Sequence, residues 1–313
     1  MKIKDLRDFI DRECRIDVAI VINVTEGKSS KGSKYLSLTL QDSTGTIEAK
    51  KWEVSSSDEA TLAIKKVVTV EGYPLIYNGS QLQFKITDVE PVSSYNEEDL
   101  ILTSPVDRKE LMNQFMEYVD SIEDEDIKTI VNEVVFNKYD KLLLHPAAKT
   151  NHHEYAGGLL HHEVSMLNLA NQIANLYPCI NKDLLFGGII LHDLGKIVEL
   201  SGPIATEYTL KGKLLGHISI IQTDIVNAAE KHNINSEIVT VLQHMVLSHH
   251  GKLEYGSPVL PLTLEAEVMY LIDNMDSKIV MINKALKDVE VGGNSARVMG
   301  LDGRSFYKHS KSK

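Results

Sequence analysis

The chain has few cysteines and no long apolar run. Of its 313 residues only Cys14 and Cys179 are cysteines, which excludes a disulfide scaffold and a cysteine-rich zinc module and favours a reducing compartment. No stretch approaches the roughly 18 uncharged apolar residues that a membrane span requires, and the first residues lack the apolar core of a signal peptide. We therefore expect a cytoplasmic protein without a membrane partner.

Positive charge is also scarce. The 44 acidic side chains outnumber the 33 lysines and arginines, and the net charge is −11, which excludes a small basic nucleic-acid module as a description of the whole chain. The acidity is local, however, because residues 96–126 hold 11 acidic and two basic side chains while both flanks are close to neutral. The charge therefore does not exclude a nucleic-acid substrate that is bound at a local basic and aromatic surface.

The first part of the chain has the pattern of short β-strands. Apolar and polar residues alternate strictly over residues 35–40, with the three leucines on one face. Asn78-Gly79 is a strong hairpin turn, and residues 57–66 can form a short helix. The pattern predicts a small five-stranded Greek-key barrel over residues 1–92. Its strands are expected at residues 16–22, 35–40, 46–52, 67–73 and 82–89.

The rest of the chain has helical periodicity. Residues 93–105 begin with a largely polar run at 93–99, end in Ser-Pro and are typical of a linker. Apolar residues then recur at helical spacing, and we expect an all-α domain over residues 106–290. Residues 291–313 are expected to be a C-terminal tail that is loose from Ser305 onward. The fold class is thus multidomain, a β barrel plus an all-α domain. Helices are expected at 160–177, 183–192, 213–232, 235–248 and 263–287.

The first 144 residues contain no histidine, and all twelve histidines lie at or after His145. A lone histidine is more often structural than a ligand, so the functional inference depends on a joint pattern of histidine and aspartate, the ligands that Mn, Fe, Zn and Ni accept. His192-Asp193 directly follows an apolar helical segment, where unpaired polar groups are costly unless they bind a ligand. The candidate metal ligands are His162, His192, Asp193, His217, His249, His250 and Asp273.

These residues resemble the H…HD…D signature of the HD-domain metal-dependent phosphohydrolases. The central motif of that family is typically His-Asp-Leu-Gly-Lys, as in residues 192–196. His217 and His249-His250 resemble the subset of the family that carries a second metal. The Gly-Gly-Leu-Leu run at residues 157–160 favours His162 over His161 as the first ligand, because the family's ligand follows such a run by one residue.

The combination of both halves resembles the YhaM family of 3′–5′ exoribonucleases over essentially the full chain. Residues 32–42 resemble the OB-fold strand-and-turn pattern of nucleic-acid binders, and residues 152–160 and 244–251 resemble the HD segments of the family. The resemblance implies an OB-like five-stranded Greek-key barrel followed by a helical HD domain. It also implies Mn-dependent removal of nucleotides from the 3′ end of single-stranded RNA, with single-stranded DNA as a further substrate.

The seven ligands exceed what one octahedral ion needs and suit two ions about 3.5–4 Å apart, as in two-metal hydrolysis of phosphate esters. Asp193 is assigned to catalysis as the bridging ligand, and Lys196 as a contact of the scissile phosphate, although a solvated lysine fits its spacing equally well. His152 and His153 are predicted phosphate contacts or, alternatively, ordinary loop histidines. Asp276 either orients a ligand histidine or has a capping or surface role. The first ion is assigned to His162, His192, Asp193 and Asp273, and the second to His217, His249 and His250.

The barrel is predicted to hold a single strand without reading its sequence, through aromatic stacking on bases and through lysines along the phosphates. Tyr35 lies opposite the leucines of its strand and is expected to face outward, and Lys50 and Trp52 share one face of the next strand. Together with Lys34, these residues are the predicted strand contacts. The alternative is that aromatic residues such as Trp52 and Phe84 fill the barrel interior.

Other functions stay open at this point. They are an HD-type nucleotidase with a regulatory barrel, a cyclic-dinucleotide phosphodiesterase and a nucleic-acid-binding protein with a relic metal site. Residues 249–258 resemble a motif of the cyclic-dinucleotide phosphodiesterases. However, Gly251 stands where that motif has Glu, and Gly-Ser-Pro stands where it has Gly-Tyr-Pro. The complete ligand set argues against the third. Mn is the expected metal, with Fe, Co or Zn as alternatives since availability decides among them, and a homo-oligomer is left open.

Overall fold

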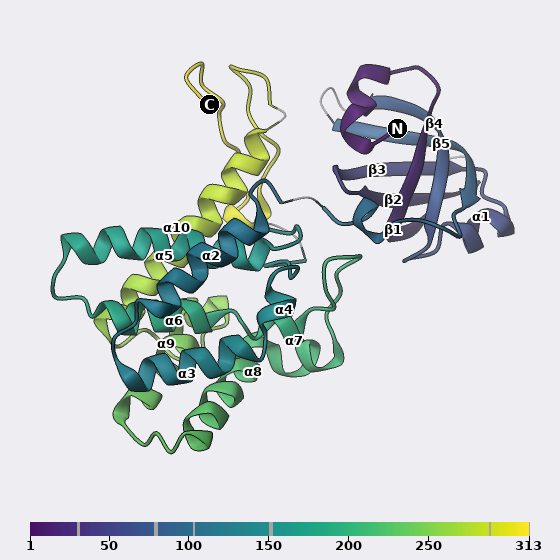
Figure 1. The fold of residues 1–313 in the computed structure, drawn as a ribbon. Coiled ribbons are helices and arrows are strands. Elements are labelled where there is room, and N and C mark those ends of the chain that lie inside the picture. The colour runs from purple at the N-terminus through teal and green to yellow at the C-terminus, as the bar shows by residue number, and fades with distance from the viewer. Residues whose placement is uncertain (30–31, 78–80, 103, 150–152, 288, 313) are drawn as a thin grey trace. The chain divides into compact units, whose positions relative to one another are not determined.

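A computed structural model of the chain describes residues 1–29, 32–77, 81–102, 104–149, 153–287 and 289–312. The chain forms two compact units, coloured purple to blue and teal to yellow in Figure 1. The first comprises Met1–Thr103 with Pro203–Thr206, and the second Ser104–Gly202 with Glu207–Lys313. The predicted domain boundaries at residues 92, 105 and 290 stay predictions.

The first unit contains a closed barrel of five strands in the order β1-β2-β3-β5-β4. All neighbours pair antiparallel except β3 and β5, which run parallel and complete the closure. This confirms the predicted Greek-key barrel, although the expected turn at Asn78-Gly79 lies outside the described residues. The strands are β1 (Cys14–Lys28), β2 (Lys34–Asp42), β3 (Gly45–Trp52), β4 (Val67–Tyr77) and β5 (Gln81–Pro91).

The barrel core follows from the alternation of the strands. The three leucines of β2 are buried, and Phe84 of β5 is fully buried inside the barrel. The helix between β3 and β4, α1 (Ser56–Thr61), is shorter than expected. It begins at a capping box on Ser55 and ends before Leu62, which is buried, and Lys65, whose φ of 69° is incompatible with a helix. A 3₁₀ turn, η1 (Ile3–Phe9), also packs on the barrel.

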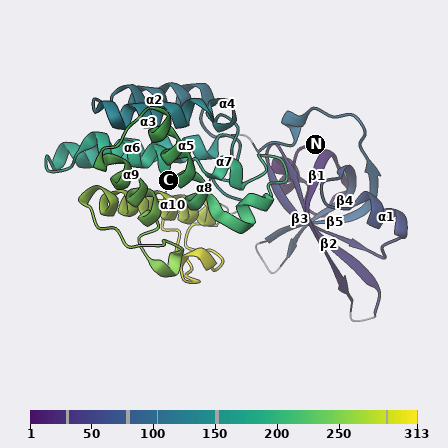
Figure 2. The same cartoon turned by 90° about the horizontal axis from the view of Figure 1, so that it is seen from below.

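The second unit is helical, as predicted. The five helices expected from the sequence all form, and each begins and ends within a few residues of its expected bounds. In Figure 2, α5 and α6 lie between α2 and α3 on one side and α9 and α10 on the other. The helices are α2 (Arg108–Asp120), α3 (Glu125–Phe136), α4 (Tyr139–Leu142), α5 (Gly158–Leu176), α6 (Lys182–His192), α7 (Lys196–Glu199), α8 (Leu210–Lys231), α9 (Glu237–Ser248) and α10 (Leu264–Leu286).

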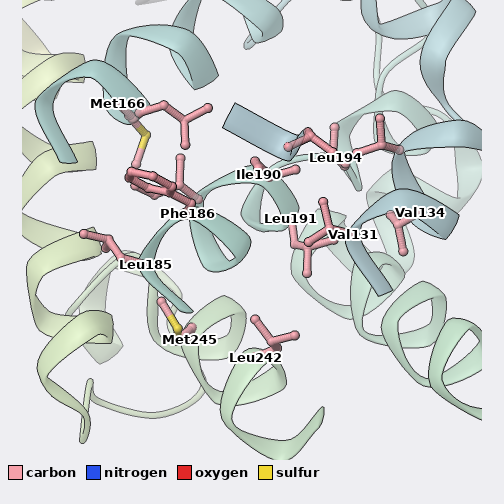
Figure 3. Close-up of a cluster of buried hydrophobic side chains, with 14 of the residues drawn as sticks. Val131, Val134, Met166, Leu185, Phe186, Ile190, Leu191, Leu194, Leu242 and Met245 are labelled. Atoms are coloured by element: carbon pink, nitrogen blue, oxygen red, sulfur yellow. The ribbon is translucent and has the colours of Figure 1, made fainter. Parts of the chain in front are cut away.

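Helix α6 is the centre of this unit. Every residue from Leu184 to His192 is buried, as expected for a helix that is apolar on all sides. Figure 3 shows Phe186, Ile190 and Leu191 of this helix among side chains of the surrounding helices. Asn181 caps the start of α6 by accepting a hydrogen bond from the Leu184 backbone. The helix therefore delivers its last residue, a histidine, into the middle of the packed unit.

The C-terminal segment differs from the expected loose tail. Isolated bridges pair Asn294 with Tyr307 and Val298 with Arg304, so residues 291–312 fold back on themselves. The Lys308 ammonium also donates to the Leu286 carbonyl at the end of α10, which ties this segment to the helical unit. No helix in the described part of the chain is both long and apolar enough to span a membrane.

Candidate functional site

The helical unit brings all seven predicted metal ligands together, and we call this set the metal centre. His162 comes from the first turns of α5, and His192 is the last residue of α6 with Asp193 as its C-cap. Asp273 lies in the middle of α10. The remaining three ligands are His217 of α8 and His249 and His250, which directly follow α9.

Asp193 lies between two sets of imidazoles. Its Oδ2 is 3.3 Å from His192 Nε2 and 3.8 Å from His162 Nε2. Its Oδ1 is 3.4 Å from His217 Nε2 and 3.8 Å from His249 Nε2. Each carboxylate oxygen therefore faces a different group of ring nitrogens, which is the arrangement that a bridging carboxylate needs.

The other ligands complete the two groups. Asp273 Oδ1 lies 3.3 Å from His162 Nε2, on the Oδ2 side of Asp193. His250 joins His217 and His249, and one ring nitrogen of each lies within 4.8 Å of the others. His192, His249 and Asp273 form a further group within the same distance of one another, so the assignment of the ligands to two separate ions stays a prediction.

The chemistry of the site fits a divalent cation. Buried ligand atoms that have no hydrogen-bond partner among the described residues include His192 Nε2, Asp193 Oδ1 and His217 Nε2. Buried polar atoms without partners are destabilising, and several that converge on one point call for an ion. Nitrogen and oxygen ligands of this kind suit a divalent transition metal.

Without a cation, the carboxylates hold protons on the imidazoles. Burial opposes the charged form of His162, but hydrogen bonds to Asp273 and Asp276 raise its pKa to about 10. Burial likewise opposes the charge of His192, yet Asp193 and Glu163 raise its pKa to about 9. Because a coordinated imidazole must be neutral, a bound cation would replace these protons.

Hydrogen bonds on the outer side fix the ring orientations. His192 Nδ1 donates to the Ile189 carbonyl at 2.6 Å, and His249 Nδ1 donates to the Val246 carbonyl at 2.7 Å. Each bond leaves the Nε2 atom of its ring directed toward Asp193. Both acceptors lie three residues earlier in the same helix, so the orientation is a local property of a histidine at a helix end.

Asp276 orients His162, in the role suggested by the sequence. Its Oδ2 accepts from His162 Nδ1 at 2.7 Å and from His153 Nε2 at 3.1 Å, and its other oxygen accepts from Ser165. Burial opposes the charge of Asp276, but these hydrogen bonds hold its pKa far below the usual range. The carboxylate therefore stays ionised and keeps the His162 Nε2 atom directed into the metal centre.

His217 reaches the metal centre through a break in its helix. Gly216 has φ 71° and ψ 158°, so α8 is kinked one residue before the ligand, and only glycine adopts this conformation readily. Beyond the kink, Glu199 Oε1 accepts from both His217 Nδ1, at 3.2 Å, and the His217 backbone, at 3.1 Å. No sequence pattern points to Glu199, because its role depends on how α7 meets α8.

Lys196 is not a solvated surface lysine. Its ammonium lies 2.6 Å from Asp193 Oδ2, and its side chain is only 12% exposed. Burial opposes the charge, but Asp193 raises the pKa of Lys196, which stays protonated. The Lys196 ammonium can contact a phosphate that reaches the metal centre.

A pocket of about 200 Å³ opens beside the metal centre. Several of its residues were not found from the sequence, because their contribution depends on tertiary packing. The pocket is lined by Asp193, Lys196, His249, His250, Tyr255, Tyr270, Asp273, Asn274 and Ser277.

Two histidines, His152 and His153, are predicted phosphate contacts. His152 lies outside the described residues. His153 is buried, and its ring bonds to Tyr155 at 2.7 Å as well as to Asp276. The structure therefore gives His153 a part in positioning Asp276 in place of the predicted phosphate contact. Glu163, also missed from the sequence, is fully buried 3.7 Å from His192 Nδ1, and burial raises its pKa to about 8.

The barrel presents a group of side chains that we call the aromatic patch: exposed Trp52 and Tyr77 with half-buried Tyr35 and Lys50. The rings of Tyr35 and Trp52 lie 4.7 Å apart, and the Lys50 ammonium lies 5.7 Å from the Tyr35 ring and 5.3 Å from the Tyr77 ring. Trp52 is 38% exposed, so the alternative that it fills the barrel interior is wrong, whereas Phe84 does fill it.

Lys34 is placed differently from the other predicted strand contacts. Its ammonium pairs with Glu26 at 2.9 Å and with Glu59 at 2.6 Å. Both carboxylates come from other elements, β1 and α1, which the sequence pattern could not bring to Lys34. Its charge is already matched within the protein, which makes it a weaker candidate for a phosphate contact than Lys50.

Comparisons with known proteins agree with both units. The HD domain family matches residues 159–278, an OB-fold nucleic acid binding domain matches residues 18–92, and a putative helicase family matches residues 94–179. The chain is 45% identical to the 3′-5′ exoribonuclease YhaM of Bacillus subtilis (strain 168), over 92% of this chain and 93% of that protein.

The chain is also similar to a second full-length relative and, over a smaller part, to a solved structure. The 3′-5′ exoribonuclease YhaM of Geobacillus sp. (strain WCH70) is 45% identical over 94% of this chain and 92% of its own length. Among solved structures, the second OB-fold domain of replication protein A from Methanococcus maripaludis is 20% identical, with a TM-score of 0.25, over 31% of this chain and 97% of that chain.

Proposed function

Because the chain belongs to the YhaM family of 3′–5′ exoribonucleases, we infer that it is a metal-dependent hydrolase that shortens single-stranded RNA from the 3′ end. The observation that carries this inference is the metal centre, where two carboxylates and five imidazoles converge inside the HD domain. A nucleotidase or a cyclic-dinucleotide phosphodiesterase is not favoured, since the relatives that match the whole chain are exoribonucleases.

We assign the ligands to two divalent ions, with Mn as the first choice. His162, His192 and Asp273 would hold one ion and His217, His249 and His250 the other, with Asp193 shared between the two sets. When bound, such ions supply an activated water and neutralise charge on the phosphate oxygens. The distances around Asp193 support this bridging assignment.

Lys196 acts beside the ligands as a phosphate contact. Its ammonium is buried against Asp193 and lines the pocket, so it lies where a phosphodiester would reach the metal centre. It can hold a non-bridging oxygen of the scissile phosphate as negative charge develops there. Asp276 and Glu199 act through His162 and His217, whose rings they orient.

The barrel binds the single-stranded nucleic acid. Aromatic rings beside a lysine suit single-stranded nucleic acid of any sequence, and the aromatic patch has this composition. We propose single-stranded RNA as the main partner and single-stranded DNA as a second substrate. We also propose a cytoplasmic location, where Cys14 and Cys179, which form no disulfide, would stay reduced.

The test is a time course with and without Mn on one RNA oligonucleotide labelled at either end. A 3′–5′ exonuclease converts the 5′-labelled strand into a ladder of shortening products and releases the 3′ label at once as a short product. Release of a labelled 5′ mononucleotide before any shortening would contradict the polarity. Activity that EDTA leaves unchanged would contradict the metal requirement.

A further inference from the structure

An enzyme that removes nucleotides from a 3′ end must hold the nucleotide that lies beyond the scissile phosphate. The pocket beside the metal centre extends past the ligands to Tyr255, Tyr270, Asn274 and Ser277. None of these four side chains belongs to the ligand sets. Their aromatic, amide and hydroxyl groups match the chemistry of a nucleoside, which offers a base to stack on and sugar hydroxyls to bond.

Three of the four residues come from one face of α10. Tyr270, Asn274 and Ser277 are spaced at i, i+4 and i+7, so they form a stripe along the helix. Asp273, one of the metal ligands, lies within the same stripe. A group bound along this stripe therefore lies directly beside the metal centre, at a distance that the helix fixes.

Tyr270 is a rigid wall of the pocket. A β-carbon at Gly251 would come within 2.2 Å of the Tyr270 ring, and Gly251 has φ 73°. Glycine at this place therefore allows the chain that follows His250 to pass against the ring. This close packing against Gly251 fixes the Tyr270 ring in place. The ring therefore shapes the pocket and is not a mobile contact.

Tyr255 lies at the pocket on the short turn η3 (Leu253–Tyr255). Its side chain is 50% exposed, and the Lys252 ammonium lies 5.1 Å from its ring. An exposed aromatic ring beside a cation is suited to stack on a nucleobase next to a phosphate, and such stacking tolerates every base. The geometry suits an enzyme that digests strands of any sequence.

We propose that this pocket receives the 3′-terminal nucleoside of the substrate, an inference that rests on the proposed exonuclease function. Tyr255 stacks on the terminal base, and Asn274 and Ser277 hydrogen-bond the hydroxyls of the terminal ribose. The pocket then distinguishes a ribose end from a 2′-deoxyribose end, while its stacking ring is indifferent to the base.

The kinetic test uses RNA oligonucleotides that differ only in the last residue, which is a ribonucleotide or its 2′-deoxy analogue. The wild-type enzyme should act on the ribose end with a kcat/KM higher by about 3- to 10-fold, the effect of one or two hydrogen bonds. In the Asn274→Ala and Ser277→Ala variants this ratio should fall toward one. The matched controls are Asn227→Ala and Ser219→Ala, at exposed positions on α8, which should keep the wild-type ratio.

Tyr255→Ala should raise KM about 10-fold for both ends, because base stacking is lost from both. Tyr177→Ala, which removes another exposed tyrosine of the helical unit, should leave KM unchanged. The inference is overturned if the ribose-to-deoxyribose ratio is the same in wild type and the α10 variants, or if the two tyrosine variants behave alike.

A binding experiment separates failure of this inference from failure of the proposed function. Titration of the Mn-loaded protein with AMP and with dAMP needs no turnover. Tyr255→Ala should weaken both complexes about 10-fold, and Ser277→Ala or Asn274→Ala should weaken AMP more than dAMP. If these shifts are absent, the pocket assignment is wrong even where the wild type digests RNA. If they are present while the wild type fails to shorten RNA from its 3′ end, the exonuclease assignment is wrong and the nucleotide pocket stands.

Discussion

The aromatic patch and the metal centre use polar groups in opposite ways. On the barrel, Trp52 and Tyr77 are exposed and Lys50 lies against aromatic rings, so these groups are satisfied without a ligand. In the helical unit, Asp193 and His192 are buried, and ligand atoms of both lack partners among the described residues. The patch therefore offers several weak and replaceable contacts, whereas the metal centre is incomplete until a cation binds and depends on every ligand.

The contrast is tested most severely at Asp193. Asp193→Ala removes the carboxylate that both ligand sets share, so we expect kcat on labelled RNA with Mn to fall on the order of 10³-fold or more. Asp140→Ala, at an exposed position of α4, should retain wild-type activity. The helical circular dichroism signal should show that both variants are folded. A folded Asp193→Ala protein with near-normal kcat would contradict the bridging role.

Asp276→Asn should have the next largest effect. The amide can still bond to His162, but it lacks the charge that holds the ring, and loss of such an outer contact lowers metal affinity by about 10- to 100-fold. Activity titrated with Mn should therefore shift to higher concentration and recover at saturation. An unchanged Mn titration would show that Asp276 has only a structural role.

The pH dependence gives a third test. The pKa values of His162 and His192 are raised to about 10 and about 9 in the folded protein. Their protonated forms stabilise the metal-free protein fully below pH about 6.5, and this contribution is lost as pH rises through 9 to 10. Mn affinity depends on pH in the opposite direction, because Mn binds only neutral imidazole rings. The affinity should therefore rise about tenfold per pH unit for each proton released.

The measurement is a set of Mn titrations and thermal melts between pH 6 and pH 9.5, with EDTA in the metal-free samples. We expect the Tm difference between Mn-loaded and metal-free protein to widen with pH. A constant difference over this range would show that these imidazoles do not exchange protons for metal.

The smallest effects are expected on the barrel. Trp52→Ala and Tyr35→Ala should each raise the Kd for single-stranded RNA about tenfold, as loss of one stacked base does. Lys34→Ala should change it less than about threefold, since its charge is already paired with Glu26 and Glu59 and such exposed pairs are weak. Tyr95→Ala, at an exposed position after the last strand, is the control. A Lys34 effect larger than that of Trp52 would reverse our ranking.

The fold was predictable where the pattern is local. The alternating leucines of β2 could face only the interior once the other face was polar, and the apolar run that ends at His192 could only be a buried helix. The C-terminal segment was not predictable in this way, because the bridges between Asn294 and Tyr307 and between Val298 and Arg304 join residues without a strand pattern.

The site residues likewise fall into those that a local sequence pattern predicts and those that depend on tertiary packing. The ligands follow from a spaced motif, and Asp276 could be suggested because it lies one helical turn after Asp273. Glu199 and Tyr255 could not be found, since they reach the site only through the packing of separate elements. The ion pairs of Lys34 could not be found for the same reason, because its two partners lie on other elements of the barrel.

Trp52 is the only tryptophan of the chain, and it lies in the aromatic patch. Excitation at the red edge of protein absorbance therefore selects a single fluorophore, at the place where a strand is expected to dock. A base that stacks on this ring would quench its emission, whereas the metal centre contains no indole and phosphodiester cleavage there would be optically silent. The protein thus carries a native reporter with which capture of a strand can be timed separately from its digestion.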